Sequence, residues 1–240
     1  MTTGTGSDES LGTNDARFHQ KEQIIEVSVF LFLIVPSLII SFFIVKQGSM
    51  IFKLIALSSI LRDLALVSLI LFFLWRNGEP LEWIGWRFKN ARAEIALGIL
   101  LFVPFSLGAG LLDKGLRMVG FTAPATPLAS VIAEKNTAEI LLATVLVIVV
   151  ALAEETIFRG YLILRFKNIM ANTAAAVLTS AVIFSLGHGY EGSAGVITVG
   201  VMGVAFAVIY LWRQSLVAPM VMHFLQDFIG IVLVPLLGIR

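Results

Sequence analysis

Long runs of apolar residues dominate the chain, and short polar stretches separate them. A helix of about 20 apolar residues is long enough to cross the ~30 Å hydrocarbon core of a bilayer. The runs predict membrane-spanning helices at residues 24–45, 54–75, 93–112, from 137 onward, 172–188, 194–211 and 216–237. Pro36 is expected to kink the first helix, and the connection with Lys114, Arg117 and two prolines is not expected to be helical throughout. We therefore expect an all-α bundle of seven or eight transmembrane helices.

The same pattern divides the chain into three parts. Residues 1–22 are polar and rich in Gly, Ser and Thr, which predicts a disordered tail without the apolar core of a cleavable signal peptide. Residues 23–136 hold the first membrane helices, with an interfacial segment near 76–92 in which Trp83 and Trp86 are expected to be surface anchors. Residues 137–240 hold the remaining helices and the polar motifs described below.

Composition and charge agree with a lipid environment. The chain is 58% apolar and 14% charged, whereas ordinary soluble domains are about 25% charged. The net charge of +1 and the lack of a basic cluster argue against a nucleic-acid partner. Lys and Arg are more frequent on the connections that share a side with the tail, so we expect a multi-pass protein of the cell membrane with a cytoplasmic N-terminus. The absence of cysteine excludes a thiolate nucleophile and Cys-ligated zinc within this chain.

Ionisable side chains inside apolar helices are the strongest chemical signal, because each costs about 2.5 to 3.5 kcal/mol at a helix centre on insertion scales. In the fourth helix, Glu155 and Arg159 are four residues apart and share a face. Glu154 is turned from Glu155 by about 100°. One carboxylate can therefore be neutralised by the arginine while its neighbour stays free to act.

The fifth and seventh helices contribute further polar groups. Phe184 and His188 end the fifth helix, and His223 and Asp227 lie four apart on one face of the seventh. Helix tilts of about 20° can absorb the differences in depth between these groups and Glu154. The geometry therefore permits the three helices to share one site.

Arg62 and Asp63 lie within the second helix. Adjacent residues on a helix do not face one another, so we do not expect an ion pair between them. We interpret both as packing or snorkelling groups.

The three motifs resemble those of the CPBP family of intramembrane proteases, formerly the ABI family. This family includes type II CAAX prenyl endopeptidases and bacteriocin-processing enzymes. Its Glu-Glu-x-x-x-Arg, Phe-x-x-x-His and His-x-x-x-Asn/Asp motifs occur in the family's order within residues 141–228, a little over a third of the chain. The resemblance assigns these residues to a catalytic site: Glu154, Glu155, Arg159, His188, His223 and Asp227.

The resemblance implies an intramembrane endopeptidase in which Glu154 is the general base for a water and His188 helps to hold that water. His223 and Asp227 are then expected to face the substrate carbonyl group. Asp227 departs from the asparagine expected in prenyl endopeptidases, and a carboxyl group donates a hydrogen bond only when it is protonated. It could instead orient His223 or join a metal site. The implied substrate is a peptide or membrane-protein segment, and the family does not decide whether it is prenylated or what the oligomeric state is.

Three alternatives stay open beside this favoured mechanism, which needs no cofactor. Glu154, His188 and His223 are a legitimate zinc set with one coordination position left for water, although the chain lacks His-Glu-x-x-His. A non-proteolytic membrane interaction or immunity protein could share the fold. Buried carboxylates and histidines also occur in proton- or cation-coupled transporters, but no internal repeat favours that class.

Overall fold

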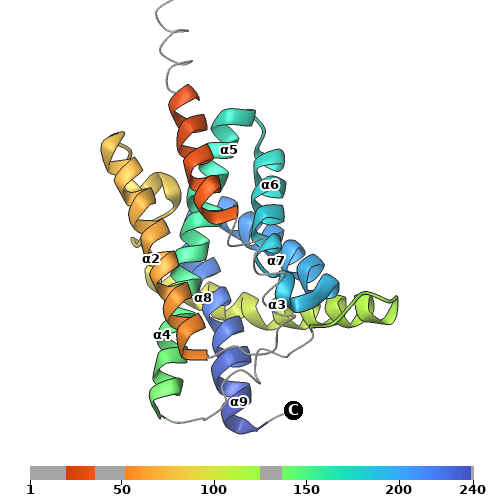
Figure 1. Cartoon of the computed structure of the whole chain (residues 1–240). Coiled ribbons are helices and arrows are strands. Elements are labelled where there is room, and N and C mark those ends of the chain that lie inside the picture. Colours follow the sequence, from red (N-terminus) through yellow and green to blue (C-terminus); the bar gives the residue numbers. More distant parts are fainter. Residues whose placement is uncertain (1–19, 36–51, 125–136, 239–240) are drawn as a thin grey trace, which may run out of the picture.

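The computed structural model describes residues 20–35, 52–124 and 137–238. Every regular element in these ranges is helical, so the expected all-α class is confirmed (Figure 1). Of the expected disordered tail, residues 1–19 lie outside the described ranges, and residues 20–22 already belong to a helix. The kink expected at Pro36 also lies outside them.

Seven helical rods can be followed through the described residues, and two of them change geometry along their length. A first helix occupies residues 20–35. The other α-helices are α2 (Phe52–Arg76), α3 (Ala91–Met118), α4 (Thr137–Glu154), α5 (Ile163–Met170), α6 (Thr173–Leu186), α7 (Gly192–Arg213), α8 (Val217–Asp227) and α9 (Val234–Leu237). Two π-helical segments, η4 (Glu155–Leu162) and η6 (Phe228–Leu233), continue α4 into α5 and α8 into α9. Two short 3-10 helices, η2 (Leu81–Ile84) and η5 (Gly189–Glu191), lie in connections.

Five helices are long and apolar enough to cross a membrane by length and composition. They are Phe52–Arg76, Ala91–Met118, Thr137–Met170, Gly189–Arg213 and Val217–Leu237. The apolar helix α6 is shorter, with 14 residues, and the first helix is described only as far as residue 35. The chain is therefore an integral membrane protein, and the number of seven or eight spans stays a prediction.

The third helix is longer than its apolar run. It continues to Met118, so Lys114 and Arg117 lie in a helix and not in the expected connection. Asp113 pairs with Arg117 across one turn at 2.7 Å. Asp113, Lys114 and Arg117 end the uninterrupted apolar run, but charged pairs four apart on a helix surface are compatible with helix.

The expected interfacial segment has only the short helix η2 within it, and its two tryptophans differ. Trp83 is exposed, as expected of a surface anchor. Trp86 instead packs inward, and its Nε1 donates a hydrogen bond to Thr156 Oγ1 at 3.0 Å. Gly160 of η4 permits this close approach, because a Cβ there would lie 2.6 Å from the carbonyl oxygen of Ile84. The segment is thus fixed against the long fourth helix.

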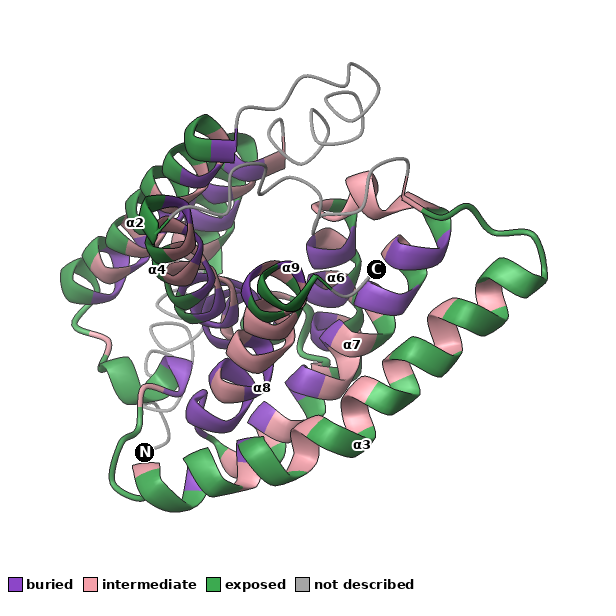
Figure 2. Cartoon of the chain, turned by 90° about the horizontal axis from the view of Figure 1, so that it is seen from below, coloured by how far each residue is buried: buried purple, intermediate pink, exposed green. Residues whose placement is uncertain are grey.

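Helix α8 lies at the centre of the bundle and packs against α3, α4 and α7. Figure 2 shows α2 and α4 side by side, while α3 runs along an edge of the molecule with most of its surface exposed. Small residues let α6 and α7 approach closely, because a Cβ added at Gly203 would lie 3.3 Å from side-chain atoms of Ala181 and Phe184.

Hydrogen bonds join parts of the chain that are distant in the sequence. Gln20 Nε2 donates to the carbonyl oxygen of Ile169, which joins the start of the first helix to the end of α5. Thr122 and Ser193 exchange hydrogen bonds between the connection after α3 and the start of α7.

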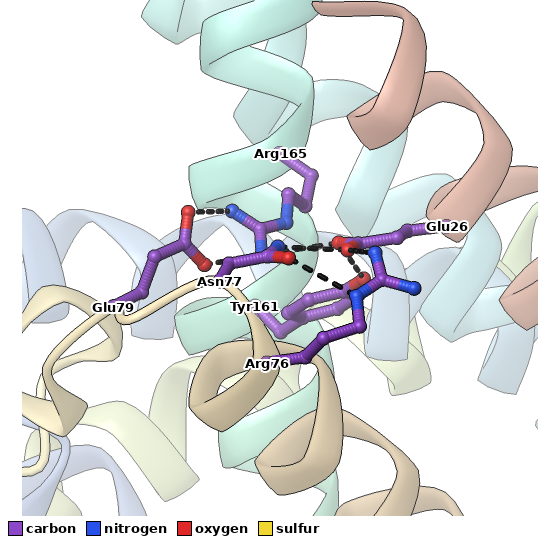
Figure 3. A network of polar contacts seen from close by, with 6 residues as sticks. All are labelled: Glu26, Arg76, Asn77, Glu79, Tyr161 and Arg165. Carbon is purple, nitrogen blue, oxygen red and sulfur yellow. Dashed lines mark hydrogen bonds and ion pairs between the residues drawn. The ribbon is translucent and has the colours of Figure 1, made fainter. Parts of the chain in front are cut away.

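A buried polar network fixes the end at which the first helix, α2 and α5 meet (Figure 3). The fully buried Arg165 binds Glu79 through two hydrogen bonds and also pairs with Glu26 at 3.1 Å. Glu26 in turn accepts hydrogen bonds from Arg76 at 2.8 Å and from the hydroxyl of Tyr161 at 3.3 Å. These contacts tie the N-terminal helices to the helix that carries the Glu-Glu-x-x-x-Arg motif.

Candidate active site

Three carboxylates surround the imidazole ring of His223 in the interior of the bundle. Nδ1 of His223 lies 2.8 Å from Oε1 of Glu155. Nε2 lies 3.7 Å from Oε2 of Glu154 and 3.4 Å from Oδ2 of Asp227. Residues separated by about 70 positions in the sequence therefore meet in space, as the motif pattern predicts.

The two carboxylates of the first motif have different surroundings. Arg159 Nη1 lies 3.0 Å from Glu155 Oε1, and both side chains are buried. The guanidinium carbon lies 4.1 Å from the ring centre of Phe184 and 5.2 Å from that of Phe206. Two aromatic faces can stabilise this buried cation, because ring quadrupoles attract positive charge. Arg159 therefore fixes Glu155, which in turn holds His223.

Glu154 is the carboxylate that remains available. Its Oε2 is buried and accepts no hydrogen bond from any described residue. The helix changes from α to π between Glu154 and Glu155, and single-turn π geometry is frequent at functional sites. The hydroxyl of Thr156 donates to the carbonyl oxygen of Leu152 at 2.7 Å where the geometry changes. A second π segment follows Asp227 directly. Sequence reasoning predicted neither segment, because no residue pattern used above distinguishes a π turn from an α turn.

His188 stands beside this cluster and not within it. Its Nδ1 lies 3.1 Å from the carbonyl oxygen of Phe184, one turn back on its own helix. The ring of Phe184 separates the two histidines, with centroid distances of 4.8 Å to His188 and 6.2 Å to His223. Within the described ranges, no hydrogen bond or ion pair joins His188 to the other five motif residues. Five of the six expected site residues thus meet, and the sixth lies across an aromatic ring from them.

Comparison with known proteins agrees with the motifs. Residues 136–229 match the type II CAAX prenyl endopeptidase Rce1-like family. The match confirms the expected resemblance to the CPBP group. The match begins one residue before α4 and ends two residues after Asp227, so it includes all three motifs. No curated protein and no solved structure matches the chain.

The Rce1-like segment covers less than half of the chain, and the first helix, α2 and α3 lie outside it. The family is one of proteases, so the match supports peptidase activity in general. It assigns no catalytic base, and the roles of the six motif residues remain predictions.

The zinc set expected as an alternative does not assemble in the Rce1-like segment. The described residues contain no group of three or more His, Asp or Glu side chains arranged to hold a metal ion. Glu154 and His223 approach one another, but His188 lies on the other side of the Phe184 ring from His223. Metal dependence therefore stays a prediction for a direct measurement.

Arg62 and Asp63 correct the sequence interpretation. Nε and Nη2 of Arg62 both lie 2.9 Å from Oδ1 of Asp63, so the two adjacent residues do form an ion pair. The arginine side chain is long enough to reach its neighbour, although adjacent residues leave the helix in different directions. Asp63 also interacts electrostatically with Glu154 and His223. The sequence did contain a signal that could have identified Asp63: two adjacent ionisable residues near the middle of an apolar span.

Phe206 is a second residue that sequence reasoning missed. Besides Arg159, its ring contacts the ring of His223 at a centroid distance of 6.0 Å. A single phenylalanine in an apolar helix carries no signal that separates this position from ordinary packing.

Proposed function

We propose that this protein is an intramembrane endopeptidase of the CAAX type in which Glu154 is the general base for a hydrolytic water. The observation that carries the proposal is the buried oxygen Oε2 of Glu154, which has no hydrogen-bond donor and lies 3.7 Å from His223 Nε2. The neighbouring Glu155 is already held by Arg159 and His223. Oε2 of Glu155 also has no hydrogen-bond partner, but the Glu155 side chain is 0% exposed, whereas that of Glu154 is 14% exposed. Glu154 is therefore the carboxylate that a water can reach.

In the proposed reaction, Glu154 first accepts a proton from the water and later donates it to the leaving group. Glu154 takes a proton from the water as the water oxygen attacks the carbonyl carbon of the peptide. The carbonyl oxygen then carries negative charge, which the Nε2–H group of His223 stabilises. As the carbon–nitrogen bond breaks, Glu154 returns the proton to the leaving amine nitrogen. Each atom and proton is then accounted for without a further reactant.

His223 is oriented for this task from two sides. Its Nδ1 donates to Glu155, which the buried Arg159 holds in place. A base or donor whose ring is fixed by a third group is the arrangement that nucleophilic and acid–base sites share. Asp227 accepts from Nε2 at 3.4 Å in the resting site. We therefore assign Asp227 to the orientation of His223 and not to donation toward the oxyanion.

The substrate class we propose is a peptide bond in, or next to, the membrane, in a membrane-associated peptide or protein. The lipid bilayer is the medium through which such a substrate reaches the site. We further propose that the protein lies in the cell membrane with its N-terminus in the cytoplasm, because Lys and Arg are more frequent on that side.

The proposal is tested by comparing membrane proteins from cells that carry the intact protein, Glu154→Gln or the control Glu94→Gln. Glu94 is a buried carboxylate paired with Arg213 at 2.6 Å, and it takes no part in the His223 cluster. We expect at least one new protein N-terminus with the intact protein and with Glu94→Gln, and its loss with Glu154→Gln. The same set of N-termini in all three samples would favour a non-proteolytic interaction protein or a transporter.

The zinc alternative is separated in the same cleavage assay by a chelator. The glutamate-base mechanism predicts that cleavage by purified protein survives removal of divalent metal. Loss of cleavage that zinc restores would favour the metalloprotease instead.

A further inference from the structure

In the ion pair of Arg62 with Asp63, the carboxylate is buried and the arginine is exposed. Snorkelling explains the exposure of the arginine but not the burial of the carboxylate. Arg62 is 40% exposed in its side chain, whereas that of Asp63 is 2% exposed. An exposed arginine can be neutralised by a carboxylate at the surface, and burying that carboxylate only adds a desolvation cost. The burial of Asp63 therefore needs a reason other than its pairing with Arg62.

The two oxygens of Asp63 have different surroundings. Oδ1 receives both contacts from Arg62. Oδ2 is buried and has no hydrogen-bond partner among the described residues. An unsatisfied buried acceptor is costly, and native proteins keep few of them. Asp63 Oδ2 shares this property with Oε2 of both glutamates of the Glu-Glu-x-x-x-Arg motif, Glu154 and Glu155.

The position of Asp63 connects α2 to the proposed active site. Helix α2 packs along α4, which ends at Glu154, and the two helices lie side by side in Figures 1 and 2. The carboxylate of Asp63 repels that of Glu154 and attracts the ring of His223 when the ring is charged, and the guanidinium group of Arg62 attracts Glu154. The low dielectric of an apolar bundle strengthens these effects. Helix α2 lies outside the segment that matches the Rce1-like family, so the match does not assign this residue.

We propose that Asp63, held by Arg62, is a positioning residue of the active site that acts through Glu154 and His223. The negative charge of Asp63 repels the Glu154 carboxylate while Arg62 attracts it. These opposed interactions hold the carboxylate in one position, next to His223 and the attacked carbonyl carbon. The attraction of Asp63 for His223 keeps the ring between the carboxylates of α2, α4 and α8. Arg62 fixes one oxygen of Asp63 and compensates part of its charge. The α2 helix thus contributes to catalysis and not only to packing.

This inference rests on the proposed peptidase activity, and its test uses purified full-length protein in liposomes. The substrate is a synthetic fluorogenic peptide that spans the cleavage site found in the membrane comparison above. The variant is Asp63→Asn, which removes the charge and keeps the size of the side chain. The matched control is Glu94→Gln, which makes the same chemical change at another buried carboxylate that pairs with an arginine. Thermal unfolding of each variant is recorded beside its kcat and KM.

For Asp63→Asn we expect kcat to fall by about tenfold or more, equivalent to ~1.4 kcal/mol of transition-state stabilisation. KM should change by less than about twofold, because an interaction used mainly in the transition state lowers kcat and kcat/KM together. Asp63→Glu, which restores the charge, should recover part of the lost kcat. Glu94→Gln should keep the kcat of the intact protein even where it unfolds at a lower temperature.

A kcat for Asp63→Asn within about twofold of the intact value would overturn the inference, as would an equal loss in Glu94→Gln. Glu154→Gln in the same assay separates this failure from failure of the proposed function. If Glu154→Gln is inactive while Asp63→Asn cleaves normally, only the role of Asp63 is wrong. If Glu154→Gln still cleaves, the base itself is misassigned.

Discussion

At the scale of single residues, the geometry of the site depends on His223. Its two nitrogens face carboxylates from three positions, Glu154, Glu155 and Asp227. When the ring carries both protons, each N–H group has an acceptor, so the ring cannot rotate without losing an interaction. A fixed ring is what a donor aimed at a developing oxyanion requires.

Asp227→Asn tests whether residue 227 must be ionised or only has to accept a hydrogen bond from His223. We expect the variant to keep cleavage within about tenfold of the intact rate, because the amide oxygen can still accept from His223 Nε2 and the amide nitrogen adds a donor. The measurement is kcat of the purified variant in liposomes. Complete loss of cleavage would mean that residue 227 must be ionised, as a metal ligand or a charged partner of His223 would be.

Much of this cluster could be predicted from residue spacing alone. The spacing of four between Glu155 and Arg159, and between His223 and Asp227, determines which groups share a helix face. The same spacing rule did not predict the pairing of Arg62 with Asp63. The rule considers the direction in which each side chain leaves the helix and does not consider the length of the arginine side chain. The position of His188 beyond the Phe184 ring depends on a side-chain packing detail that no sequence pattern encodes.

At the scale of elements, the long helix Thr137–Met170 carries both the catalytic motif and the network that anchors it. Its middle is the π segment η4, in which every residue is buried. Beyond that segment, Arg165 joins the helix to the end of α2 and to the first helix (Figure 3). These contacts hold the helix at a position beyond the motif. We therefore expect the network to affect the free energy of unfolding more than the rate of catalysis.

Arg165→Met is expected to lower the free energy of unfolding by about 3 kcal/mol, because it leaves Glu79 and Glu26 without their buried partner. The matched control is Arg117→Met, which removes an arginine from a more exposed pair with Asp113 and should cost less than about 1 kcal/mol. Both values can be measured by following helix content during denaturation with SDS. Equal losses in the two variants would contradict a special role for the buried network.

Helix positions were largely predictable because polar residues end most apolar runs. The second helix and the start of the fourth agree with the structure to within about two residues, the usual spread between assignment methods. The extension of α3 to Met118 was not predicted, because charged residues interrupt the apolar run in its last two turns although the helix continues there. The network of Figure 3 was not predictable, since its residues are scattered over three sequence regions and only the fold brings them together.

At the scale of the whole molecule, the three spans expected between the tail and the connection after α3 predict that these two segments lie on opposite sides of the membrane. The chain has no cysteine, so a single introduced cysteine reports its own side without interference. We expect Val119→Cys, at an exposed position after α3, to react with a membrane-impermeant maleimide in intact cells. Ser7→Cys in the tail should react only after the membrane is permeabilised. The reverse labelling would contradict a cytoplasmic N-terminus.

The central claim is that Glu154 activates the water that cleaves a peptide bond inside the membrane. Its most direct test is the cleavage rate of purified Glu154→Gln protein in liposomes, next to the intact protein and with thermal unfolding as a check of folding. Loss of a general base predicts a rate at least about 100-fold lower in a protein that unfolds at a similar temperature. A folded Glu154→Gln variant that cleaves at the intact rate would contradict the claim.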